Sequence, residues 1–275
     1  PIRRCTTMTR NIFDPDEALA HQQVKTRKTR ANKEKPVAIK EKFAEQRLAS
    51  VVTITPKTEN QGKALDLMKK RQVVVLRGSS GSGKSYLACT HAANRYLKGE
   101  VERIVLIRPY EMVGKSIGLR PGSGDDKLRP LMQSMLQSLE RVFGKPQLEA
   151  KIASGNVVLE ALEDVRGRSY SNSVVVVDEA QNTDKQAMKA LLTRLEESSQ
   201  LIICGDGKQK DTKAESGIDW AVSLIDKARK ERPKYLNDAD YYQACNNFGS
   251  VTFTNDDIVR SGFTALMVKL FDEEG

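Results

Sequence analysis

The sequence has no long apolar run. None of its 275 residues lies in a stretch approaching about 18 consecutive apolar positions, which argues against a membrane-spanning helix. Arg3 and Arg4, near the amino terminus, are not followed by an apolar segment, so a secretory signal is not expected. Together these absences predict a cytoplasmic protein with no membrane partner.

Cysteine is also scarce. The four cysteines are Cys5, Cys89, Cys204 and Cys245. They lie far apart and none has CxxC spacing, which argues against a zinc site or a disulfide framework. The same pattern favours a reducing compartment.

Aromatic residues make up only 5 % of the chain, and no aromatic-glycine motif of the RNA-recognition type is present. The sequence therefore gives no sign of base stacking, and binding to nucleic acid would depend mainly on phosphate contacts. A net charge of +9 makes nucleic acid a candidate partner. Residues 1–50 carry +6 of that charge, from 12 Lys and Arg against 6 Asp and Glu, and the remainder carries +3.

Residues 1–50 are predicted to form a basic amino-terminal arm, separate from a single core over residues 51–275 that ends in a carboxyl-terminal helix starting after Thr254. Between residues 24 and 42, basic residues are frequent, large apolar residues are sparse and Pro36 interrupts the segment. Such a segment cannot bury enough apolar surface to offset its ordering entropy. It is either mobile or ordered on a partner, or it is a tail that only improves solubility.

After Ser50, short apolar runs alternate with amphipathic stretches. Four runs have the character of strands buried on both faces: Val73–Leu76, Ile104–Ile107, Val174–Val177 and Leu201–Cys204. Three stretches have helical spacing: Ser85–Leu97, Asp126–Val142 and Asp184–Glu196. This alternation predicts an α/β fold of three layers, in which helices cover both faces of a parallel sheet and ligands bind at the carboxyl ends of the strands.

A complete GxxxxGK[ST] motif follows the first of these runs. It consists of Gly78, Ser79, Ser80, Gly81, Ser82, Gly83, Lys84 and Ser85. An apolar strand before it and a helical pattern after it are the context that a phosphate-binding loop requires. The glycines let backbone N–H groups surround a phosphate at the positive end of the helix. Lys84 is expected to neutralise the β- and γ-phosphates of ATP, and Ser85 to bind Mg²⁺.

A pair of carboxylates follows the run of four valines. Asp178, at the end of a buried strand, would be costly to bury without a positive partner, and Mg²⁺ is the expected one. Glu179 is placed to orient or deprotonate water beside the γ-phosphate. Adjacent acids of this kind favour hydrolysis over transfer to an acceptor, and no acceptor-binding motif is evident.

The spacing of these motifs resembles the PhoH-like ATPases, P-loop proteins related to superfamily 1 helicases. The resemblance extends from about Thr55 to Gln209. It includes the segments 56–61, 108–109, 119–122, 128–131, 166–168, 178–183, 192–194 and 205–209. Ser79 and Ser80 stand where the family commonly has Pro-Ala, and residues 230–247 follow no family pattern. The resemblance implies a RecA or superfamily 1-like P-loop fold.

The resemblance also implies roles for several side chains. Gln61 corresponds to the glutamine that reads the adenine edge, and Gln181 and Gln209 to glutamines that sense the γ-phosphate. Arg108 follows a buried strand, where it either contacts a nucleic-acid backbone or holds a loop by a salt bridge. Arg166 and Arg168 suit phosphate binding, and a structural pairing with Asp164 is the alternative.

The chain has one phosphate loop and no room for a second core. Superfamily 1 helicases cleave ATP between two cores, the second of which supplies an arginine worth on the order of 10³–10⁵ in rate. A neighbouring subunit is the natural source here, and the resemblance implies a hexameric ring. The candidate arginine finger is Arg260, which follows a capping-box spacing formed by Thr254 and Asp257.

Three functions are compatible with these features. The leading hypothesis is an Mg²⁺-dependent ATPase that couples hydrolysis to binding or unwinding of single-stranded nucleic acid, with RNA favoured by the resemblance. The second is a nucleotide-dependent regulatory or scaffold protein without motor activity. The third is a P-loop kinase for a small substrate.

Overall fold

A computed structural model describes residues 47–109, 128–206 and 216–259, together with residues 262, 263, 266, 267 and 270. The strands are β1 (Val73–Gly78), β2 (Arg103–Arg108), β3 (Val157–Ala161), β4 (Ser173–Val177), β5 (Gln200–Gly205) and β6 (Phe248–Phe253). The α-helices are α2 (Glu59–Lys70), α3 (Lys84–Leu97), α5 (Gln133–Phe143), α6 (Lys145–Ala153), α7 (Lys185–Thr193), α8 (Gly217–Lys230) and α9 (Asp238–Asn247). Short 3₁₀ turns are η1 (Leu162–Val165), η2 (Ala180–Asn182) and η3 (Asn255–Asp257).

The strands form one parallel sheet in the order β3-β2-β4-β5-β1-β6. Because all strands run the same way, the phosphate loop after β1 and the acidic pair after β4 lie at the same, carboxyl edge. Strand β5 lies between them. All four predicted strands are present, each one to two residues longer than its apolar run.

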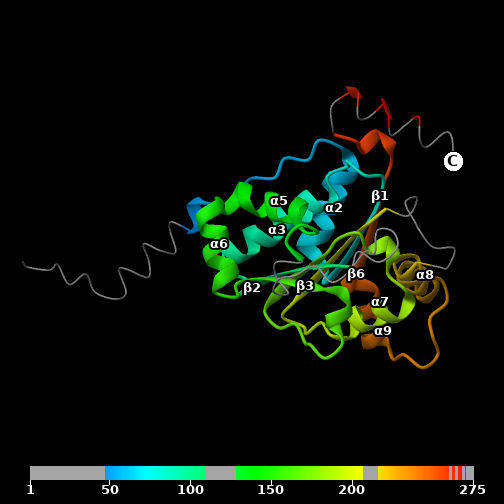
Figure 1. The fold of residues 1–275 in the computed structure, drawn as a ribbon. Helices are drawn as coiled ribbons and strands as arrows, with labels where there is room; N and C mark the ends of the chain where they lie inside the picture. The colour runs from blue at the N-terminus through cyan, green and yellow to red at the C-terminus, as the bar shows by residue number, and fades with distance from the viewer. Residues whose placement is uncertain are drawn as a thin grey trace, which may run out of the picture. The chain divides into compact units, whose positions relative to one another are not determined.

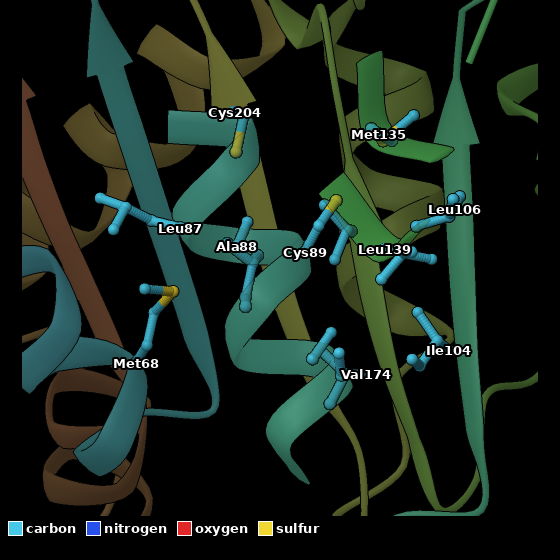
Figure 2. Close-up of a cluster of buried hydrophobic side chains, with 14 of the residues drawn as sticks. Met68, Leu87, Ala88, Cys89, Ile104, Leu106, Met135, Leu139, Val174 and Cys204 are labelled. Carbon is cyan, nitrogen blue, oxygen red and sulfur yellow. The ribbon is translucent and has the colours of Figure 1, made fainter. Parts of the chain in front are cut away.

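Helices cover both faces of the sheet, which confirms the predicted three-layer α/β fold (Figure 1). Alternate strand residues pack into opposite layers. In β1, Val74 and Leu76 pack with α2, α3 and α5, whereas Val75 packs with α7 and α8. Figure 2 shows the first layer, where Leu87, Ala88 and Cys89 of α3 lie against the sheet. Burying a large aliphatic side chain in this way stabilises the fold by about 1.5–3 kcal/mol.

Two predicted helices differ from the observed ones. The helix expected over Asp126–Val142 is interrupted: Leu128 is helical, residues 129–132 form turns around Pro130, and α5 then runs from Gln133 to Phe143. Residues 126 and 127 lie outside the described residues. Proline disfavours helix in the residue before it and cannot donate a backbone hydrogen bond. The helix expected over Asp184–Glu196 ends early, at Thr193.

No helix among the described residues is long and apolar enough to cross a membrane. Cys89, Cys204 and Cys245 are free thiols. Cys5 and most of the predicted amino-terminal arm lie outside the described residues. Arg47, at the end of that arm, donates to the Tyr96 carbonyl at 2.6 Å and lies over its ring.

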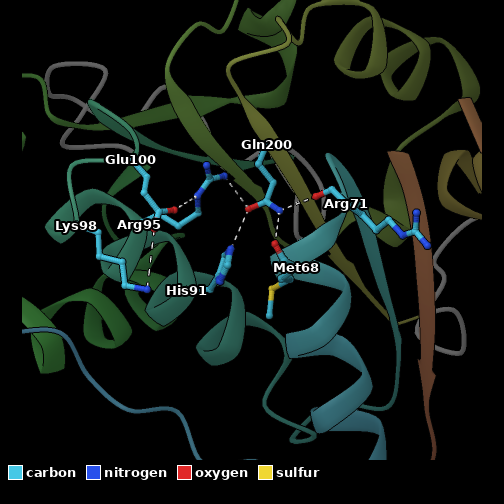
Figure 3. A network of polar contacts seen from close by, with 7 residues as sticks. All are labelled: Met68, Arg71, His91, Arg95, Lys98, Glu100 and Gln200. Carbon is cyan, nitrogen blue, oxygen red and sulfur yellow. Dashed lines mark hydrogen bonds and ion pairs between the residues drawn. The ribbon is translucent and has the colours of Figure 1, made fainter. Parts of the chain in front are cut away.

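A buried polar hub joins three elements at the amino edge of the sheet (Figure 3). Gln200, the first residue of β5, donates to the carbonyls of Met68 and Arg71 at the end of α2, at 2.6 and 2.7 Å. Its side-chain oxygen faces His91 Nε2 at 2.9 Å and Arg95 Nη1 at 3.3 Å, both from α3. The hub fixes the far ends of helices whose first turns line the nucleotide site.

Acidification is expected to weaken this hub. Burial lowers the pKa of His91 from 6.5 to about 4, so the folded chain favours neutral imidazole. Stability contributed by His91 is therefore complete above pH 6.5 and is lost as the pH falls toward 4, by up to about 3 kcal/mol. Urea unfolding at pH 7 and pH 4 measures this loss, and His91→Gln is the matched control. An equal pH dependence in the control would contradict the assignment.

Candidate nucleotide-binding site

The phosphate loop has the backbone conformation that its glycines predict. Gly78, Gly81 and Gly83 have φ angles of +128°, +87° and +86°, a region that residues with side chains rarely adopt. Gly83 is the N-cap of α3, so the loop leads directly to the positive end of that helix. The loop can therefore surround a phosphate with backbone N–H groups.

Lys84 is buried inside this loop. Its ammonium donates to the carbonyls of Gly78 and Ser79 at 2.6 and 2.9 Å and lies 3.4 Å from Ser82 Oγ. Burial lowers the pKa of Lys84, while nearby carboxylates, among them Asp206 and Asp178, oppose the shift. The cation is thus held by oxygen atoms of its own loop, at the position where phosphate charge would be neutralised.

Ser85 and Asp178 are brought into direct contact from α3 and the end of β4. Ser85 Oγ donates to Asp178 Oδ1 at 2.6 Å, and Asp178 is only 5 % exposed. Burial raises the pKa of Asp178, and the hydrogen bond from Ser85 opposes that effect. A hydroxyl and a buried carboxylate beside a phosphate loop are oxygen donors of the kind that Mg²⁺ prefers, so these two residues fit the predicted metal site.

Glu179 has a positive φ of 53°, an uncommon conformation for a residue other than glycine. One carboxylate oxygen lies 3.6 Å from Arg108 Nη2, and the other accepts a 2.7 Å hydrogen bond from Gln181 Nε2. Arg108 also donates to the Leu131 carbonyl. Of the two alternatives for Arg108, the structure has the salt bridge, and its partner is the predicted catalytic carboxylate.

Gln181 continues this chain of contacts to the phosphate loop. Its side-chain oxygen accepts from the backbone N–H of Asp206 at 3.1 Å, and Asp206 Oδ2 accepts from the N–H of Ser80 at 3.0 Å. Asp206 follows β5 and so lies between the loop and the acidic pair. Asp206 had no predicted role, although one residue alone separates it from the apolar run Leu201–Cys204.

Residues after β6 hold the outer side of the loop. Ser79 Oγ donates to Asn255 Oδ1 at 2.9 Å, and the N–H of Val259 donates to the Gly81 carbonyl at 3.2 Å. The predicted capping box of Thr254 and Asp257 is present, but it caps the three-residue 3₁₀ turn η3 and does not start the expected final helix, because the backbone is extended at Ile258. Asn255 was not predicted, because nothing local marks a residue 176 positions from its partner.

Gln61 is 4 % exposed and joins two walls of the site. Its Nε2 donates to the Ser82 carbonyl at 3.0 Å, and its Oε1 accepts from the N–H of Lys57 at 2.8 Å. An amide has one further donor and acceptor position at these atoms, so adenine recognition remains a prediction. A cleft of about 770 Å³ extends from here past Tyr86 and Arg141 to Glu179.

Of the predicted nucleic-acid arginines, Arg108 contacts Glu179 of the cleft, whereas Arg166 and Arg168 do not line it. Arg168 Nη1 pairs with Glu160 Oε1 at 3.2 Å, not with Asp164, and Glu160 also accepts from Tyr170 at 2.8 Å. Arg166 is exposed at the end of η1. Contact with nucleic acid stays a prediction for Arg108, Arg166 and Arg168. Gln209 and Arg260 lie outside the described residues.

Known proteins with a similar sequence are described as PhoH-like protein or as Protein PhoH2. A family model described as PhoH-like protein matches residues 53–272. The PhoH-like protein of Bacillus subtilis is 29 % identical over 224 residues, which are 81 % of this chain and 65 % of that protein. The PhoH-like protein of Mycobacterium tuberculosis is 36 % identical over 177 residues, 63 % of this chain and 50 % of that one. The chain thus spans about half to two thirds of these curated relatives.

Solved structures with a related fold include two phage proteins. The UvsW helicase from bacteriophage T4 matches 78 % of this chain and 67 % of its own, with 15 % identity and a TM-score of 0.40. The HK97 bacteriophage large terminase matches 84 % of this chain and 52 % of its own, with 14 % identity and a TM-score of 0.43. The family model covers the whole phosphate loop, the acidic pair and the sheet that positions them, and the chain therefore belongs to the PhoH-like family.

Proposed function

We propose that this chain is an Mg²⁺-dependent ATPase that couples hydrolysis to the binding of single-stranded nucleic acid, RNA rather than DNA, within an oligomeric ring. The observation that carries the proposal is the convergence of Lys84, the Ser85–Asp178 pair and Glu179 on one cleft. They come from two places at the carboxyl edge of the sheet, the phosphate loop after β1 and the end of β4, and together they match the parts that ATP hydrolysis requires.

The residues divide the chemistry among themselves. The loop N–H groups and Lys84 bind and orient the phosphates, and Gln61 orients the base. Ser85 and Asp178 would hold Mg²⁺, which supplies positive charge at the β- and γ-phosphates when bound. Glu179 orients the attacking water and accepts its proton, and Gln181 holds the Glu179 carboxylate.

One observation favours the second candidate, a nucleotide-dependent switch with slow turnover. Both oxygens of the Glu179 carboxylate are engaged, one by Arg108 and one by Gln181. Each carboxylate oxygen keeps a further acceptor position, but the two partners fix the orientation of the carboxylate and so limit which water it can reach. Nucleic acid that contacts Arg108 would remove one of these partners, whereas a switch would keep both.

ATP turnover with and without single-stranded RNA distinguishes the candidates. Stimulation by RNA supports the coupled ATPase, and RNA binding should weaken steeply with salt, with a log–log slope of roughly −0.7 per phosphate contacted. Slow turnover that RNA does not change supports the switch, and phosphate on a third compound supports a kinase. Lys84→Ala is the control for contaminating ATPases.

Mixed subunits test whether Arg260 acts in a neighbouring chain. Lys84→Ala and Arg260→Ala chains are each expected to be inactive, because each lacks one essential cation. In an equal random mixture, about a quarter of the sites would combine an intact loop with an intact neighbouring arginine in a ring. Recovered turnover near that fraction supports a shared site. No recovery after demonstrated subunit exchange would place Arg260 in its own chain, beside the loop that Val259 contacts.

A further inference from the structure

The turn after α8 and the helix α9 form an exposed corner, defined here as residues 227–242. No residue of α9 is buried, although the helix has ten residues and an Asn237 N-cap. Arg229 ties the corner to the core by donating to the carbonyls of Cys245 and Phe248 at 2.8 and 2.6 Å. A helix without a buried face is anchored by few contacts and leaves its side chains available to a partner.

This corner lies at the edge of the sheet opposite the nucleotide cleft. Phe248, the first residue of β6, pairs in register with Val73, the first residue of β1, whereas the phosphate loop follows the last residue of β1. A strand of this length separates the two edges by roughly 20 Å. In Figure 1, α9 accordingly lies beside the sheet and next to α8, away from α2 and α3.

Two tyrosine rings at the corner face solvent. Tyr235 is 84 % exposed and Tyr242 is 61 % exposed. Tyr242 makes an edge contact with Tyr241, at 5.5 Å between centroids, and Arg232 lies 5.5 Å from the Tyr241 ring. Tyr242 thus contacts a ring beside which Arg232 lies, and most of its own side chain is exposed.

Unpaired cations flank these rings. Lys227, Lys230 and Lys234 form no ion pair within the part of the chain that the structure describes. The nearby aspartates are occupied instead. Asp226 pairs with Arg229, Asp238 with Arg232, and Asp240 accepts from Asn237. Glu231 is the remaining carboxylate of the corner, and it forms no ion pair with the described residues.

We infer that this α8–α9 corner binds single-stranded nucleic acid, with bases stacked on Tyr235 and Tyr242 and phosphates near the lysines. Every base has a face that can stack, and exposed rings beside cations are what sequence-independent single-strand binding uses. Tyrosine and arginine are enriched in protein–protein interfaces and lysine is depleted, so the three lysines are the feature that favours nucleic acid over a protein partner. The inference rests on the proposed function and adds a contact site remote from the ATP cleft.

Fluorescence anisotropy with a labelled 20-nucleotide single-stranded RNA tests the inference on the full chain. The pair Tyr235→Ala/Tyr242→Ala is expected to raise Kd by at least about tenfold, because each ring lost removes a stacking platform. Tyr235→Phe/Tyr242→Phe keeps both rings and is expected to bind as the wild type does. Both positions are exposed, so the thermal unfolding midpoint should not change.

The lysines provide a second, independent readout. Lys230→Gln/Lys234→Gln is expected to make the log–log salt dependence of binding shallower by about 1.4, since each phosphate contact on a single strand contributes about 0.7. The same variant should hydrolyse ATP without RNA at the wild-type rate. An unchanged salt dependence would show that Lys230 and Lys234 do not contact the phosphates of the RNA.

The outcomes separate this site from the proposed function. Equal Kd for the alanine pair and the wild type would overturn the corner as a binding site, even if RNA still stimulated ATP turnover. RNA binding that depends on the tyrosines without any ATP turnover would support the corner and contradict the proposed ATPase. A change in oligomer mass with unchanged RNA affinity would assign the corner to contacts between copies of the chain and overturn the inference.

Discussion

Glu179→Gln is expected to bind ATP with nearly the wild-type affinity and to hydrolyse it about 10²–10⁴ times more slowly. The amide has the size and shape of the carboxylate, so the cleft, the phosphate loop and Lys84 remain in place. It cannot accept a proton from water at neutral pH. The loss should therefore appear in the chemical step, with little change in nucleotide affinity.

Single-turnover phosphate release and equilibrium binding of a fluorescent ATP analogue measure the two quantities separately. Glu102→Gln is a matched control, because Glu102 is an exposed glutamate in the turn before β2, outside the cleft. Its turnover should equal that of the wild type. Hydrolysis by Glu179→Gln at the wild-type rate would show that Glu179 is not the base. Another carboxylate of the cleft, such as Asp206, would then be the candidate.

Arg108 provides a physical link between nucleic acid and the Glu179 carboxylate. Its guanidinium lies at the end of β2 and contacts Glu179 from the carboxyl edge of the sheet. The predicted nucleic-acid contact and the observed salt bridge are therefore alternatives for the same side chain. A phosphate that competes for Arg108 would leave Glu179 with Gln181 alone, which is a direct physical route by which nucleic acid could alter hydrolysis.

The sequence predicted the central strands better than the edge strands. The four central strands are covered on both faces, so each contains four consecutive apolar residues. Strands β3 and β6 lie at the edges and were missed. Glu160 interrupts the apolar pattern of β3, and β6 contains Gly249, Ser250 and the exposed Thr252. An edge strand has one neighbour, and its composition is correspondingly less constrained.

The candidate site likewise contains residues that the sequence predicted and contacts that it could not predict. Lys84 and Ser85 were predictable because a contiguous motif carries them, and Asp178 and Glu179 because they end a buried strand. The links from Asp206 to Ser80 and from Asn255 to Ser79 join residues 126 and 176 positions apart. Such pairs depend on which strands become neighbours, and periodicity along the chain contains no information about strand order.

Gly78→Ala is expected to destabilise the fold by at least about 3 kcal/mol and to abolish ATP binding, by combining a steric clash with backbone strain. A Cβ atom at this position would lie 2.1 Å from the Phe253 carbonyl oxygen and 2.8 Å from its carbonyl carbon. Both belong to the backbone of β6, which is paired with β1 and cannot move without breaking that pairing. The φ of +128° adds strain in a region nearly exclusive to glycine.

Gly99→Ala separates the clash from the strain. Gly99 also has a positive φ, +74°, but a Cβ there would meet no atom within 4 Å. This variant should lose only about 1–2 kcal/mol, the usual cost of a left-handed backbone for alanine. Urea unfolding of both variants, with ATP binding measured below the transition, gives the comparison. Equal stability of the two would mean that β6 does not press on the phosphate loop at Gly78.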